Sequence, residues 1–184
     1  IHPNYDCKPQ DVKGEAGVRP EPIVARCEER KIAAGEDCVN IGMGEVDKAD
    51  RCHSSALDAL PDPFTTEDLV RALNILIVNF DTNKSEVPPE RLAALQKAAG
   101  YIKRAGPAVV LEIGGHTDNV GGTASNQTLS DSRALAVKEK LIVFGVRSEA
   151  LQTRGYGATK PKTDNGTEQG RFINRRIEYS IVKK

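Results

Sequence analysis

A glycine-rich segment over residues 114–133 carries one acidic and one basic side chain where they could recognise a ligand. Its four glycines allow tight bends and close approach of a ligand to the main chain, and Asp118 lies in the middle. Arg133 lies four residues after Leu129 and four before Val137, on the apolar stripe of an expected helix. Arginine is seldom buried without a partner. The two charges therefore form either an internal ion pair or two halves of a ligand site.

The same segment contains residue types used by hydrolases. His116 and Asp118 could activate Ser125 or Ser130 as a nucleophile. The sequence has no Gly-x-Ser-x-Gly elbow and no metal-binding helix motif, and the glycine loop lacks the Gly-Lys-Ser/Thr ending of a phosphate loop. A single His with no second His or Cys nearby is more often a packed side chain than a metal ligand. We therefore expect no catalytic residue, metal or cofactor, and keep a hydrolase that uses His116 and Asp118 as the alternative.

The elements that must position these residues alternate between strands and helices. Apolar runs and turn residues predict strands over residues 74–80, 109–113, 151–154 and 176–182. They also predict a short helix from Thr65, a helix that starts at Pro88-Pro89, and a helix capped by Ser125 or Asn126 that stops at Gly145. This order, βαβαββ, predicts a two-layer α/β (α+β) sandwich with a mixed sheet of about four strands and helices on one face.

Residues 1–63 differ from the rest of the chain. They hold 13 acidic and 8 basic side chains, a net charge of −5 that leaves +5 on residues 64–184. Short helices are expected over residues 23–34 and 47–60, and the prolines at 61 and 63 suggest a domain boundary. We expect a small N-terminal region of unknown role over residues 1–63 and a second domain over residues 64–184.

All four cysteines lie in the first region, which is otherwise poor in core-forming residues. Two disulfides among Cys7, Cys27, Cys38 and Cys52 are the expected arrangement, with all three pairings open, and they indicate an oxidising compartment. A zinc site is the competing interpretation, but no Cys-x-x-Cys spacing supports it. Ile1 in place of an initiator Met fits a removed signal peptide or a trimmed chain.

Composition excludes several classes of function. The chain has 184 residues, 39% of them hydrophobic, which supports a globular core. An aromatic fraction of 4% without Trp argues against a sugar-stacking platform. No apolar run approaches the roughly 20 residues needed for a transmembrane helix. The basic character of residues 64–184 suits an anionic or carboxylate-rich partner and is too weak to indicate nucleic acid.

Several short motifs of residues 65–184 together resemble a known family. They are Phe80-Asp81-Thr82-Asn83-Lys84, Gly115-His116-Thr117-Asp118, Asn126, Leu129-Ser130, Arg133-Ala134, Gly155-Tyr156-Gly157 and Asn174-Arg175-Arg176. In this order and spacing they resemble the OmpA-like peptidoglycan-binding domain, also found at the C-terminus of MotB-type proteins. Nothing before residue 64 takes part in the resemblance.

The resemblance implies a ligand and a role for each site residue. Proteins of this family hold the diaminopimelate of the peptidoglycan peptide stem without cleaving it. By this resemblance, Asp118 takes the ligand's ammonium and Arg133 its carboxylate. Hydrogen bonds would come from Thr117, Asn126 and the backbone near Val120, and Arg175 would close the site.

The resemblance also implies a place in the cell. The expected partner is peptidoglycan, the expected location is the periplasm or cell envelope of a Gram-negative-type bacterium in association with the outer membrane, and the expected role is anchoring. Residues 1–63 could add a protein-interaction module for an envelope partner.

A zwitterionic amino-acid end requires one anion and one fixed fork of donors in its receptor, and Asp118 and Arg133 supply this pair.

Overall fold

The computed structural model describes residues 37–39 and 41–184. The chain divides into two compact units, Ile1–Ile41 and Gly42–Lys184, and the second contains all the elements discussed below. The helix expected over residues 23–34 and the cysteines Cys7 and Cys27 lie outside the described residues.

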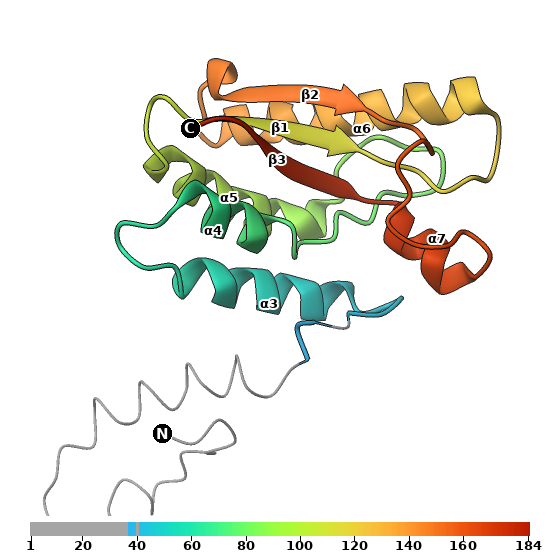
Figure 1. Ribbon diagram of the computed structural model, residues 1–184, viewed down its shortest axis with the longest axis horizontal. Helices are drawn as coiled ribbons and strands as arrows, with labels where there is room; N and C mark the ends of the chain where they lie inside the picture. The colour runs from blue at the N-terminus through green and yellow to red at the C-terminus, as the bar shows by residue number, and fades with distance from the viewer. Residues whose placement is uncertain (1–36, 40) are drawn as a thin grey trace, which may run out of the picture. The chain divides into compact units, whose positions relative to one another are not determined.

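A mixed sheet forms one layer of the second unit (Figure 1). Its strands are β1 (Val110–Gly115), β2 (Leu151–Gly155) and β3 (Ile177–Lys183), in the spatial order β2-β1-β3. β1 pairs with β2 in parallel and with β3 in antiparallel orientation. These strands confirm the three predicted over residues 109–113, 151–154 and 176–182, and they confirm the mixed sheet of an α+β fold.

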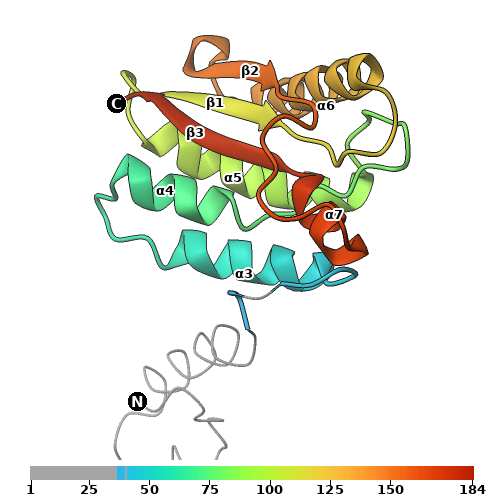
Figure 2. The ribbon, with the colours of Figure 1, turned by 45° about the vertical axis from the view of Figure 1, so that its right-hand side comes forward.

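Helices cover one face of this sheet, as Figures 1 and 2 show. α6 (Thr123–Val143) packs on β2 and β1, α5 (Leu92–Arg104) packs beside α6, and α4 (Thr66–Leu73) packs against β3. The core between the layers is made of apolar side chains that the sheet and the helices bury, including Leu111, Ile113, Leu95, Val137 and Leu141. Burial of this apolar surface is the main force that holds the layers together.

Three helix ends follow local chemistry that the sequence predicts. Thr65 caps α4, because its hydroxyl accepts a hydrogen bond from the Asp68 N–H at 3.1 Å. Pro89 opens the short 3₁₀ helix Pro89–Arg91 that leads into α5. Gly145 follows α6 with φ of 102°, a left-handed conformation that favours glycine and ends the helix.

The predicted cap of α6 is wrong. The helix begins at Thr123, after Gly122, and no side chain caps it. The Asn126 amide instead donates to the carbonyl of Val120 at 3.0 Å, so it holds the preceding loop.

The prediction of a strand over residues 74–80 is also wrong. Leu76 and Val78 are buried alternately, as in a strand, but the segment makes no ladder with the sheet. The Asn74 amide occupies the edge of β3 in its place. Its oxygen accepts from the Tyr179 N–H at 2.7 Å and its nitrogen donates to the Tyr179 carbonyl at 3.0 Å. One side chain thus satisfies backbone groups that a fourth strand would have paired.

The second unit also includes a helix that the sequence places in the first region. α3 (Val46–Asp58) confirms the helix expected over residues 47–60, and it packs on α4 and α5. Ala49 and Leu57 are fully buried, and Nδ1 of His53 lies 2.8 Å from the carbonyl oxygen of Ala72. The compact unit therefore starts at Gly42 and not after residue 63. The prolines at 61 and 63 mark a connection between two packed helices.

Cys38 and Cys52 are each disulfide-bonded. This confirms the oxidised state expected for these two residues. Among the described residues, no helix is both long and apolar enough to cross a membrane.

Candidate ligand-binding site

A cavity of about 440 Å³ lies beside the loop that follows β1. Its walls come from that loop, the first turns of α6, the segment over residues 77–83, and the end of α7 (Glu168–Asn174). The structure brings all six residues expected to contact a ligand into this one cavity, namely Thr117, Asp118, Val120, Asn126, Arg133 and Arg175.

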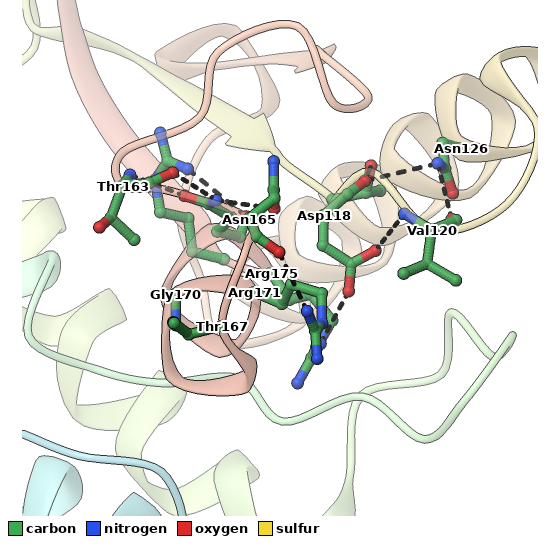
Figure 3. A network of polar contacts seen from close by, with 12 residues as sticks. Asp118, Val120, Asn126, Thr163, Asn165, Thr167, Gly170, Arg171 and Arg175 are labelled. Atoms are coloured by element: carbon green, nitrogen blue, oxygen red, sulfur yellow. Dashed lines mark hydrogen bonds and ion pairs between the residues drawn. The ribbon is translucent and has the colours of Figure 1, made fainter.

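Asp118 is held by its own loop and by one side chain (Figure 3). It is 8% exposed, and its Oδ1 accepts from the Val120 N–H at 2.9 Å. Its Oδ2 accepts from Nη1 of Arg175 at 2.7 Å. The loop is fixed by the Asn126 amide and by the Thr117 hydroxyl, which donates to the Asp118 carbonyl at 2.9 Å. The loop therefore presents a carboxylate in one defined orientation.

Arg133 is bound by backbone carbonyls and not by Asp118. Its Nε donates to the Lys84 carbonyl at 2.9 Å and its Nη2 to the Asp81 carbonyl at 3.1 Å. Its guanidinium carbon lies 4.9 Å from the centre of the Phe80 ring, within the range of a cation–π contact. Nη1 makes no hydrogen bond to any described residue. Among the described residues, Asp118 and Arg133 therefore form no direct ion pair.

The guanidinium of Arg133 is nevertheless sensitive to the other charges of the cavity. Burial lowers its pKa from the ordinary value, the nearby Arg175 lowers this pKa further, and Asp118 raises it. Burial therefore acts against the charge, which an anionic group of a ligand would stabilise.

α7 positions Arg175, and the sequence analysis missed this helix. Thr167 caps it, since its hydroxyl accepts from the Gly170 N–H at 3.0 Å. At the last residue of the helix, the fully buried Asn174 accepts from the N–H groups of Lys162 and Thr163. Figure 3 shows this network beside the Asp118 loop. The capping Thr with Glu168 in the first turn was the signal that could have predicted the helix.

The residues considered for a hydrolase are not brought together. Ser130 is fully buried, and its hydroxyl donates to the Gln127 carbonyl and accepts from the Gly157 N–H at 2.9 Å. Ser125 donates to the Gly122 carbonyl at the start of α6. Within the described residues, neither hydroxyl bonds to His116, so the arrangement offers no activated serine.

His116 is a packed side chain at the end of β1. It is 6% exposed and stacks on Tyr156, with ring centres 4.9 Å apart. Burial lowers its pKa to about 4, Arg176 and Lys160 lower it as well, and Glu178 raises it. The imidazole is therefore neutral near pH 7 and adds no charge to the cavity.

The low pKa of His116 predicts a loss of stability in mild acid. The folded pKa lies below the unfolded value of about 6.5, so unfolded chains bind the proton more readily. The unfolding free energy is therefore highest above about pH 6.5, where His116 is neutral in both states, and it decreases as the pH falls towards 4. Between pH 7 and pH 5 the wild type should lose about 1–2 kcal/mol more unfolding free energy than His116→Gln.

Urea unfolding of both proteins at the two pH values measures this difference. The pKa of His53 is also lowered, mainly by burial, but both proteins keep this residue, so its effect cancels in the comparison. An equal loss in wild type and variant would show that His116 is not the group responsible.

Known proteins are similar in sequence to the segment that contains this cavity. Residues 79–175, more than half of the chain, match the OmpA family. The chain is 32% identical over 169 residues to outer membrane porin F of Pseudomonas aeruginosa, covering 91% of this chain and 45% of the porin. It is 34% identical over 120 residues to the peptidoglycan-associated lipoprotein of the same species, covering 65% of this chain and 69% of the lipoprotein.

The fold has counterparts among solved structures. The crystal structure of the peptidoglycan-associated lipoprotein from Burkholderia pseudomallei superposes with a TM-score of 0.50 at 29% identity, over 58% of this chain and 88% of the lipoprotein chain. The present chain spans less than half the length of the porin it matches. The matched segment contains Asp118, Arg133 and Arg175, and with its extent and the shared fold it shows that the chain belongs to the OmpA family.

Proposed function

We propose that the unit over residues 42–184 binds peptidoglycan non-covalently and so anchors the protein, or the membrane to which it is attached, to the cell wall. The names of the lipoprotein relatives support a peptidoglycan partner, and that of the porin supports an outer-membrane setting. On this proposal the domain works in the periplasm of the cell envelope. We also propose that the first region, residues 1–63, contacts another envelope protein.

One observation carries the proposal. A single cavity contains a buried carboxylate and a buried guanidinium, each fixed by the backbone of a different segment. A receptor for a zwitterionic amino-acid end needs such a pair, since an anion binds the ammonium and a planar fork of donors binds the carboxylate. Holding both charges in place before the ligand arrives reduces the entropy lost on binding.

The ligand we propose is the diaminopimelate of the peptide stem. Asp118 binds its ammonium through Oδ2, and Arg133 binds its carboxylate through the Nη1 edge that makes no hydrogen bond to described residues. Thr117 and Asn126 act mainly by fixing the loop, while the backbone at Val120 adds a polar contact. Arg175 borders the same subsite.

The proposed activity is binding without cleavage. The relatives include a porin and a lipoprotein, and the serines near the cavity are engaged with backbone groups. The domain should therefore leave the wall fragments that it binds intact.

Co-sedimentation with purified sacculi tests the proposal. The protein should pellet with sacculi whose stems contain diaminopimelate, and free diaminopimelate should release it. Sacculi with lysine in the stem provide the control, because the side chain of lysine has an ammonium but no second carboxylate. Failure to pellet with the first kind, equal pelleting with both, or release of soluble muropeptides would contradict the proposal.

A further inference from the structure

The cavity contains more positive than negative charge. Among its lining residues, Asp118 is the one acid, whereas Arg133, Arg175 and Arg176 are cations. Arg176 has a carboxylate of its own, because its Nε lies 2.7 Å from Oε2 of Glu178. Asp118 is thus shared by two arginines, one in direct contact and one at longer range. A ligand with one ammonium and one carboxylate would leave this excess of one positive charge in place.

The two arginines differ in how firmly they are held. Arg133 is bound by two backbone carbonyls and the Phe80 ring, and it is 8% exposed. The side chain of Arg175 is 39% exposed, and its one hydrogen bond to a described residue is that to Asp118. Arg175 also follows the last residue of α7, where the backbone has left helical geometry. Arg175 can therefore leave its partner at little cost, whereas Arg133 cannot.

Arg175 occupies the place that a ligand's ammonium requires. Oδ1 of Asp118 is committed to the Val120 N–H, so Oδ2 is the oxygen available to a bound cation, and Arg175 holds it. An incoming ammonium must displace the guanidinium or share this oxygen with it.

Resting on the proposed function, we propose that Arg175 exchanges partners when the ligand binds. The ligand's ammonium replaces Arg175 at Asp118, and the released guanidinium binds a second carboxylate of the same ligand. Arg175 is then a specificity-determining residue, and the preferred ligand carries one ammonium and at least two carboxylates.

The exchange leaves no charge unpaired in the cavity. Asp118 keeps a cation throughout, and Arg175 passes from one carboxylate to another. If the second carboxylate is neutralised, the released guanidinium of Arg175 points into solvent, and the affinity that this contact adds is lost. The contact is partly exposed, so we expect the second carboxylate to contribute about a tenfold gain in affinity and not a hundredfold one.

Calorimetric titration of the full chain with two synthetic stem peptides measures this contribution. The peptides both end in diaminopimelate with its ammonium and adjacent carboxylate free, and differ in whether the second carboxylate is free or amidated. Wild type should bind the acid about ten times more tightly than the amide. Arg175→Gln should bind the two alike and should bind the amide at least as well as wild type does, because the competitor for Asp118 is gone.

Two further variants separate this role from a general effect of charge or folding. Arg154→Gln removes an exposed cation of β2 that does not line the cavity, and it should keep the tenfold preference. Arg175→Lys retains a cation at the end of α7 and should keep most of the preference.

The titrations distinguish failure of the proposed function from failure of the partner exchange. If wild type binds neither peptide, the proposed function is wrong. If wild type binds both and Arg175→Gln keeps the full preference for the acid, or if folded Arg175→Lys loses it entirely, the exchange is wrong and the proposed function stands.

Discussion

Asp118→Asn is expected to pellet with sacculi at least thirtyfold more weakly than wild type while remaining as well folded. The substitution keeps the shape of the side chain and an oxygen that can accept the Val120 N–H. It removes the charge that attracts an ammonium. Loss of a sheltered charge-assisted contact weakens binding by about 2 kcal/mol or more, which corresponds to roughly thirtyfold.

The stability of Asp118→Asn should change by less than about 1 kcal/mol, because Arg175 is partly solvated and can turn into water. Melting curves and pelleting on the same preparation separate the two effects. Glu139→Gln, on the exposed side of α6, makes the same change of charge away from the cavity and should pellet like wild type. A folded Asp118→Asn protein that pellets like wild type would end the hypothesis.

Asp118 is a sharper test position than Arg133. The Arg133 side chain ties down the turn over residues 81–84 through two carbonyls, so its removal disturbs the cavity wall as well as the charge. If an Arg133 variant bound sacculi more weakly, the loss of a ligand contact and the loss of local structure would both explain the result. Asp118→Asn has nearly the same shape as wild type, so it changes the charge without this second effect.

The sequence predicted which residues meet in the cavity better than how they are held. Asp118 and Arg133 are separated by a glycine loop and the start of a helix, and such local spacing is visible in a sequence. The partners of Arg133 lie 49 and 52 residues away, and the partner of Asp118 lies 57 residues away. Contacts at such separations depend on how the elements pack, which periodicity does not encode.

The strand predicted over residues 74–80 failed for a related reason. Alternating burial of Leu76 and Val78 is real, but whether an extended segment joins a sheet depends on what else satisfies the sheet's edge. Here the Asn74 amide bonds to both backbone groups of Tyr179. The segment is left to line the cavity, and the turn that follows it holds Arg133.

α6 approaches the sheet so closely that two strand ends admit only glycine. A Cβ atom added at Gly115 would lie 2.2 Å from the Ser130 carbonyl oxygen, and one at Gly155 would lie 2.2 Å from Oδ1 of Asp131. Real Cβ contacts are essentially never shorter than 3.0 Å. The obstacle at Gly115 is main chain, which cannot turn aside as a flexible side chain could.

Gly115→Ala is therefore expected to destabilise the protein by about 3 kcal/mol or more, since α6 must move off β1 to admit one methyl group. The same movement reaches the site, because the Asp118 loop starts directly after Gly115 and Arg133 lies one helical turn beyond Ser130. Molecules that remain folded should bind sacculi more weakly than wild type.

Gly100→Ala is the matched control, since nothing lies within 4 Å of its added Cβ in α5 and alanine favours helix by about 0.5–1 kcal/mol. Urea unfolding of both variants should shift in opposite directions, and a Gly115→Ala protein within 1 kcal/mol of wild type would contradict this account of how α6 sets the distance between the two charges.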